Sequence, residues 1–139
     1  AAAGNRILGV FAGCQYTATD GEVKFARYFP TGTATQGGGD VTAYIYDDPN
    51  IVYAIQSAGS ADFADIGQLA DHVAGTGDTS TGQSKFEISG TTGTGTAGMR
   101  ILGLYETPKN AFGTNGILEA TIHEHELNQH IDADGTVGV

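Results

Sequence analysis

The sequence predicts an all-β domain, either a small antiparallel β-barrel or a β-sandwich, of about eight strands with at most one short helix. Short runs rich in β-branched and aromatic residues recur along the chain, and glycine-rich or Asp-containing segments separate them. Glycine makes up 22 of the 139 residues, about twice its usual share of roughly 7%. A parallel α/β sheet would need helical patterns of about 10–15 residues between its strands, and no such patterns separate these runs.

The first two strands are predicted to form a hairpin. Residues 7–17 and 22–29 are the paired runs, and an Asp-Gly turn joins them. In the returning run, Val23 and Phe25 are the apolar residues expected to face the interior, and Lys24, which alternates with them, is expected to face solvent.

A second hairpin is predicted from residues 41–46 and 51–56. Both runs alternate aromatic and β-branched residues, and the segment at residues 47–50 reads Asp-Asp-Pro-Asn, which is typical of a turn.

The later elements are less regular. Residues 60–70 show apolar spacings of three and four, but Gly67 weakens the pattern, so one short helical turn or none is expected. Further strands are expected at residues 85–88, 99–105 and 117–127. Residues 1–127 are thus the predicted β domain, and residues 128–139, which lack periodicity, are a predicted C-terminal tail or arm.

Composition and charge exclude several classes of function. The 16 acidic against 6 basic residues give a net charge of −10, which disfavours nucleic acid as a partner because phosphate binding needs clustered Lys and Arg. No apolar run approaches the length of about 18 residues that spans a bilayer, so no membrane is expected as a partner. The single cysteine, Cys14, excludes an internal disulfide.

The most promising candidates for chemistry are His123, His125 and His130, which lie beside two glutamates. A zincin helix needs its second histidine four residues after the first, and Leu127 occupies that position here. On a strand, His123 and His125 would share one face about 7 Å apart and would need a third ligand from His130 or His72. We expect an edge or interface strand with a polar face instead, and we predict no catalytic residue, metal or cofactor.

The other motifs have structural explanations. Residues 132–135 (Asp-Ala-Asp-Gly) resemble the start of a calcium loop but lack its third carboxylate and closing glutamate, which favours a simple turn. Asp47 and Asp48 also suit a turn, although adjacent acids can share a cation or meet an arginine across an interface. The G-x-G-x-x-G at residues 93–98 is not expected to join a strand to a helix, so no phosphate site is predicted, and Cys14 is interpreted as a small buried apolar residue.

The order of these segments resembles that of small structural proteins of tailed bacteriophages, particularly the head decoration or cement proteins. The resemblance covers most of residues 7–127 and depends on strand and turn segments. These are residues 7–17, Tyr-Phe-Pro-Thr-Gly at 28–32, residues 43–50, Asp-Ile-Gly at 65–67, residues 75–82, residues 100–104 and the strand that ends at 123–125.

The resemblance implies a virion protein on the capsid surface. It implies binding to the major capsid protein, self-association as a homotrimer, and stabilisation of contacts between neighbouring capsomers, with no enzyme activity. Tyr44, Tyr46 and Tyr53 could alternate between core and interface in such a protein. A glycan- or receptor-binding adhesin or fibre module is the alternative function, and a metal-dependent hydrolase that uses residues 123–130 is the least favoured one.

Overall fold

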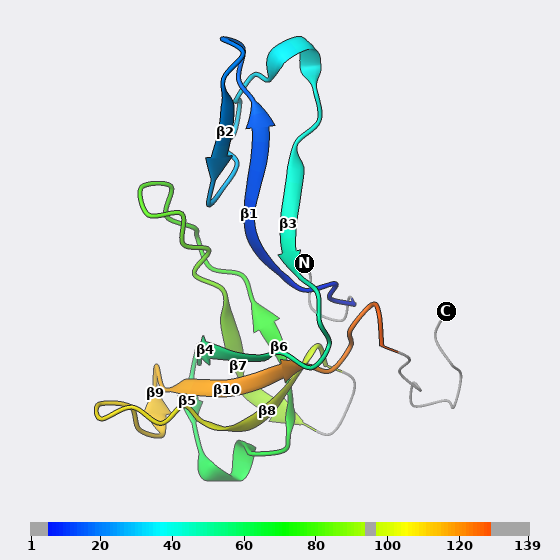
Figure 1. The fold of residues 1–139 in the computed structure, drawn as a ribbon. Helices are drawn as coiled ribbons and strands as arrows, with labels where there is room; N and C mark the ends of the chain where they lie inside the picture. The colour runs from blue at the N-terminus through cyan, green and yellow to red at the C-terminus, as the bar shows by residue number, and fades with distance from the viewer. Residues whose placement is uncertain (1–5, 94–96, 129–139) are drawn as a thin grey trace.

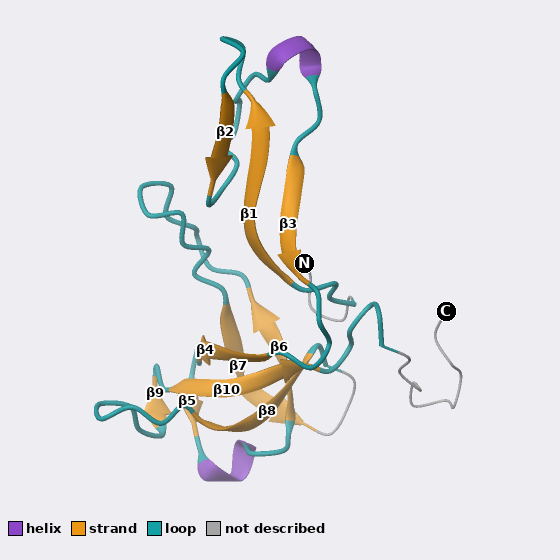
Figure 2. Ribbon diagram, in the orientation of Figure 1, coloured by secondary structure: helices purple, strands orange, loops and turns teal. Residues whose placement is uncertain are grey.

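The computed structural model describes residues 6–93 and 97–128, and it confirms the predicted all-β class. The described residues form ten strands, two of them only two residues long, and two three-residue 3₁₀ turns (Figure 2). The strands are β1 (Val10–Thr17), β2 (Val23–Ala26), β3 (Thr42–Tyr46), β4 (Val52–Gln56), β5 (Ser60–Ala61), β6 (Leu69–Val73), β7 (Glu87–Gly93), β8 (Met99–Leu104), β9 (Gly113–Thr114) and β10 (Ile117–Ile122).

The strands divide into a projecting sheet and a larger body. The three-stranded sheet has the order β2-β1-β3 and stands away from the rest of the molecule (Figure 1). The body holds a five-stranded sheet, in the order β4-β10-β8-β6-β7, and the short pair β5-β9. All the strand pairs are antiparallel, and none of these sheets closes into a barrel, so the sandwich-like class fits the described part of the chain.

The first hairpin has the predicted form. The amide of Gly21 donates to the carbonyl of Ala18 at 2.9 Å, and the amide of Ala18 donates to the carbonyl of Glu22 at 2.8 Å. Gly21 has a φ of +85°, a conformation that costs little only without a Cβ. The Asp-Gly pair therefore sets the register of β1 and β2.

The second predicted hairpin is wrong, although both of its strands exist. β3 pairs with β1 in the projecting sheet, whereas β4 pairs with β10 in the body. The turn between them does form, with the Ile51 amide donating to the Asp48 carbonyl at 3.2 Å. It carries the chain from one sheet to the other, because alternation identifies a strand without identifying its partner.

The core of the body lies on the inner side of the five-stranded sheet. Beyond the end of β4, Ser57 forms an isolated bridge with Ile88 of β7, so the two outer strands of the sheet approach each other. The buried residues that form this core are Ala61, Ala70, Ile88, Met99, Ile101, Leu118 and Ala120.

Several predictions need correction at their boundaries. The runs at residues 7–17 and 22–29 are strands only at Val10–Thr17 and Val23–Ala26, and the strand predicted at residues 85–88 is β7, Glu87–Gly93. The short helical turn in residues 60–70 is a 3₁₀ turn at Phe63–Asp65, and its cap is Asp62. The last predicted strand ends at Ile122 instead of continuing to residue 127. A second 3₁₀ turn, Gln36–Gly38, was not predicted, because its glycines favour no regular element.

Candidate functional site: the open face of the projecting sheet

The projecting sheet has two faces of different character. Residues directly opposite each other on neighbouring strands lie on one face, since side chains alternate along a strand. The pairs Thr17–Val23, Gln15–Phe25 and Gly13–Tyr44 therefore share one face. We call this the open face. Its residues are Val10, Gly13, Gln15, Thr17, Val23, Phe25, Thr42, Tyr44 and Tyr46.

Large apolar side chains on the open face are exposed to solvent. Phe25 is 71% exposed and Tyr46 is 59% exposed, whereas such side chains are usually buried in a sheet that packs on a core. Val10, Val23 and Tyr44 are also exposed. None of the nine residues of the open face carries a charge.

A shallow depression of about 280 Å³ lies in this sheet. Gly13 lies in it, next to Phe25 and Tyr44, and Arg27 lies at its rim. A Cβ at Gly13 would come within 2.9 Å of the carbonyl oxygen of Ala26, so the position requires glycine. The hydroxyl of Tyr44 donates to Oε1 of Gln15 at 2.7 Å, which orients the Tyr44 ring over the sheet.

The opposite face of the sheet is covered at one end. Cys14 and Tyr16 are buried there, and the Tyr16 ring meets Phe29 edge-on with centroids 5.2 Å apart. Cys14 is thus the small buried apolar residue that its sequence predicts. Phe11 and Ile45, toward the other end of this face, are exposed to about the same extent as Val10 and Tyr44 on the open face.

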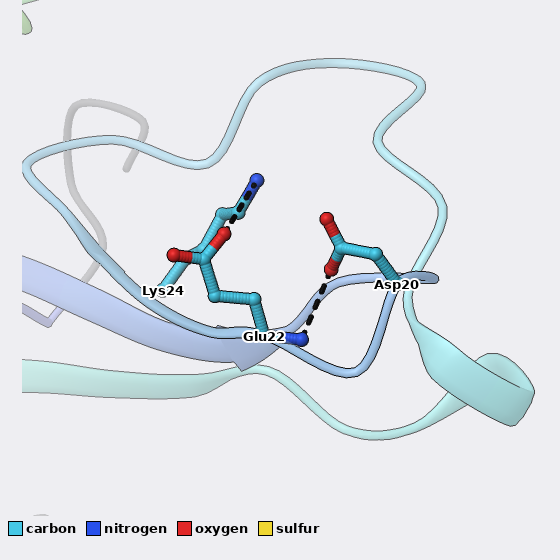
Figure 3. Close-up of polar contacts among 3 residues, drawn as sticks. All are labelled: Asp20, Glu22 and Lys24. Atoms are coloured by element: carbon cyan, nitrogen blue, oxygen red, sulfur yellow. Dashed lines mark hydrogen bonds and ion pairs between the residues drawn. The ribbon is translucent and has the colours of Figure 1, made fainter.

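Charges lie at the tip of the hairpin and on the covered face (Figure 3). Lys24 Nζ lies 3.5 Å from Glu22 Oε2, and Asp20 Oδ1 accepts a hydrogen bond from the Glu22 amide at 3.0 Å. Lys24 pairs with Tyr16, so it lies on the face opposite Phe25. An exposed ion pair of this kind contributes little stability, typically about 0–1 kcal/mol.

The outward orientation of Phe25 reverses the sequence interpretation. Alternation assigns Val23 and Phe25 to the interior and Lys24 to solvent, and the structure does the opposite, since Val23 and Phe25 are the more exposed. Alternation gives the two faces of a strand but not the face that meets the core. No single stretch of the sequence signals this reversal, because the uncharged positions of the open face are spread over three strands.

The acidic turn at Asp47 and Asp48 lies where the projecting sheet joins the body. Asp48 Oδ1 accepts hydrogen bonds from the Asn50 amide at 2.8 Å and from Asn50 Nδ2 at 3.1 Å, as turn chemistry predicts. The Tyr53 hydroxyl donates to the Tyr46 carbonyl at 3.2 Å and links β4 to the end of β3. Partial burial raises the pKa of Tyr53, and the carboxylates of Asp48 and Asp47 raise it further.

The histidines do not form the predicted polar strand. β10 ends at Ile122, and His125 turns inward to be almost fully buried. Its Nδ1 accepts a hydrogen bond from the Leu127 amide at 3.1 Å, and its Nε2 has no partner. His72 is also buried, with its ring stacked on Phe86 and neither ring nitrogen hydrogen-bonded.

In the described ranges 6–93 and 97–128, no three His, Cys, Asp or Glu side chains come together as metal ligands. His130 and the calcium-like residues 132–135 lie outside the described residues, as do residues 94–96 of the G-x-G-x-x-G. Gly93, the first residue of that motif, ends β7, and Met99, which follows the motif, begins β8, so the motif connects two strands rather than a strand and a helix.

A second depression, of about 270 Å³, lies between β6 and β7. Hydroxyl groups of Ser89, Thr91 and Thr92 line it together with the carboxylate of Asp71, which accepts a hydrogen bond from the Gly98 amide at 3.3 Å. Among the described residues that line it, none is a histidine or a lysine.

No helix in the described parts of the chain is long and apolar enough to cross a membrane. Comparison with known proteins gives no matching family model, no matching curated protein and no matching solved structure.

Proposed function

We propose that this chain is a structural protein of a virion, a capsid decoration or cement protein. It binds the outside of a phage head through the major capsid protein and stabilises contacts between capsomers, and it self-associates, with a homotrimer as the expected form. The observation that carries the proposal is the open face. Phenylalanine and tyrosine side chains are exposed together on a projecting sheet, and contiguous apolar surface of this kind marks an interaction site.

The resemblance to decoration proteins gives the proposal its biological setting. The acidic surplus of the chain suits a basic surface on a partner.

The test is removal of the protein from native particles and its return. Particles stripped of this chain should rupture at a lower temperature, and purified protein added back should restore the original value. Electron microscopy of the restored particles should show the protein at fixed positions between capsomers. Particles that are equally stable with and without the protein would refute the proposal.

A glycan-binding module is the second candidate, and one observation favours it. Phe25 and Tyr44 flank the depression at Gly13, and aromatic rings beside a depression can stack on sugar rings through apolar contact. Binding on a glycan array that is lost in a Tyr44→Ala variant would support this function. Particle stability that is unchanged by the protein would support it further.

A further inference from the structure

We infer that the open face is a self-association surface, covered in solution by the projecting sheet of a second copy of this chain. The inference rests on the self-association included in the proposed function, and it does not depend on binding to a capsid. Five large apolar or aromatic residues are exposed together on this face: Val10, Val23, Phe25, Tyr44 and Tyr46. Contiguous apolar surface of this kind marks an interaction site in soluble proteins.

The distribution of charge favours the projecting sheet of a second copy, rather than its body, as the occupant. Residues 1–46, which include the whole projecting sheet, contain three acidic and three basic residues, so they are neutral. Residues 47–139 contain 13 acidic and three basic residues and carry the entire formal charge of −10. Two copies that meet through their bodies would oppose these charges, whereas two copies that meet through their projecting sheets would bring neutral surfaces together.

The geometry permits such a contact. The projecting sheet stands away from the body (Figure 1), so a second sheet can approach it without bringing the two acidic bodies into contact. Lys24 lies on the opposite face, and Asp20 and Glu22 lie at the hairpin tip. No charged side chain of β1, β2 or β3 is therefore buried when the open face is covered, and Arg27, which follows β2 and lines the depression at Gly13, has to stay hydrated at the border of the interface to avoid a desolvation cost.

The size of the face predicts a weak interface. The three strands have 8, 4 and 5 residues, so at about 3.3 Å per residue and about 4.8 Å between strands they cover roughly 270 Å², well below the roughly 800 Å² per partner of a standard stable interface. Association should therefore depend on concentration over the micromolar range. Many copies held on one shell would strengthen it through effective concentration.

The test is sedimentation velocity of the purified chain between about 1 and 200 µM. The wild-type chain should shift from monomer to oligomer as the concentration rises. Phe25→Asp should remain monomeric throughout this range, because it puts a charge on the open face in place of the most exposed apolar side chain there. Phe63→Asp is the matched control, since Phe63 is equally exposed at 73% but lies in the body, and it should associate as the wild type does.

A wild-type chain that stays monomeric up to the highest concentration would overturn the inference. Association that survives in Phe25→Asp would also overturn it and would indicate pairing through the free edges of β2 or β3. If Phe25→Asp fails to give the wild-type circular dichroism spectrum, Tyr46→Asp provides the same test at a second exposed position. A chain that self-associates through this face but does not stabilise particles would sustain this inference while refuting the proposed function.

Discussion

His72 and His125 are both buried, but their ring nitrogens are satisfied to different extents. His125 Nδ1 accepts the Leu127 amide, whereas neither nitrogen of His72 has a hydrogen-bond partner. A buried polar atom without a partner costs about 1–3 kcal/mol.

His72→Leu should therefore raise the free energy of unfolding by about 1 kcal/mol, because it removes two unsatisfied nitrogens from the interior. His125→Leu should leave the free energy of unfolding about unchanged, since the gain from removing the unsatisfied Nε2 is offset by loss of the hydrogen bond from the Leu127 amide, worth about 1 kcal/mol. Urea denaturation of the two variants measures both effects. Equal losses of stability in the two variants would contradict this account of the histidines.

Asp78 provides a pH-dependent prediction at the same scale. The Ser80 hydroxyl donates to Asp78 Oδ1 at 2.6 Å and the Ser80 amide donates at 2.8 Å. These bonds, the hydroxyl first, lower the pKa of Asp78 below its ordinary value of 3.8. Because the pKa is lowered in the folded state, ionised Asp78 adds to the free energy of unfolding. This added stability is present above the unfolded pKa and is lost as pH falls through the folded pKa.

Ser80→Ala should raise the pKa of Asp78, while the remaining amide bond keeps it below the ordinary value. Carbon-detected NMR titration of the side-chain carboxyl measures the change directly. Ser84→Ala, in the same segment, is the control and should leave the pKa of Asp78 unaltered. If Ser80→Ala leaves the pKa of Asp78 unchanged, the Ser80 hydroxyl is not the main cause of its lowering.

The close approach of β7 to the residues after β4 depends on two glycines. The nearest atom to a Cβ built on Gly90 is the Cα of Gly59, at 2.7 Å, so neither position has room for a side chain. Gly103 in β8 has nothing within 4 Å of its Cβ position, which makes it a matched strand glycine without this constraint.

Gly90→Ala should lower the free energy of unfolding by about 1–3 kcal/mol, the usual cost of overpacking. Gly103→Ala should change it little, because the added methyl meets open space. Thermal denaturation of the two variants provides the comparison. Similar melting temperatures for the two variants would mean that the approach of β7 is looser than described.

Local sequence patterns predicted which residues form strands better than they predicted which strands pair with each other. The Asp-Gly turn identified the first hairpin, because the turn and both paired strands are adjacent in sequence. The turn after Tyr46 looked equally local, yet β3 and β4 join different sheets. Pairing of β3 with β1 and of β4 with β10 is non-local, and no turn residue specifies it.

The histidine-rich segment, the candidate site in the sequence, shows the same limit, because non-local contacts decide its structure. Its residues suggested a polar strand, but the amides of His123 and Glu124 bond the Gly98 carbonyl, at 2.8 and 3.3 Å, and end the strand pairing. His125 is then drawn into the interior, where it forms an isolated bridge with Ile7. These contacts join residues far apart in the chain, so periodicity could not predict them.

At the scale of the whole molecule, the chain separates into a neutral projecting sheet and an acidic body. The uncharged positions of the open face occur in three strands and alternate with residues of the other face, so no single stretch of sequence displays them. The open face became visible only when the pairing of β1, β2 and β3 placed its residues together. An oligomer joined through these sheets would leave the acidic bodies outside, available to a basic partner.

Hydroxyl-radical footprinting of the free chain and of the chain in its native assembly tests this account most directly. Phe25, Tyr44 and Tyr46 should be oxidised in the dilute free chain and protected in the assembly, because the open face is the surface that joins copies. Phe63, which is equally exposed but lies in the body, measures the general protection due to assembly. Equal oxidation of Phe25, Tyr44 and Tyr46 in the free and assembled chains would contradict the assignment of the open face as the joining surface.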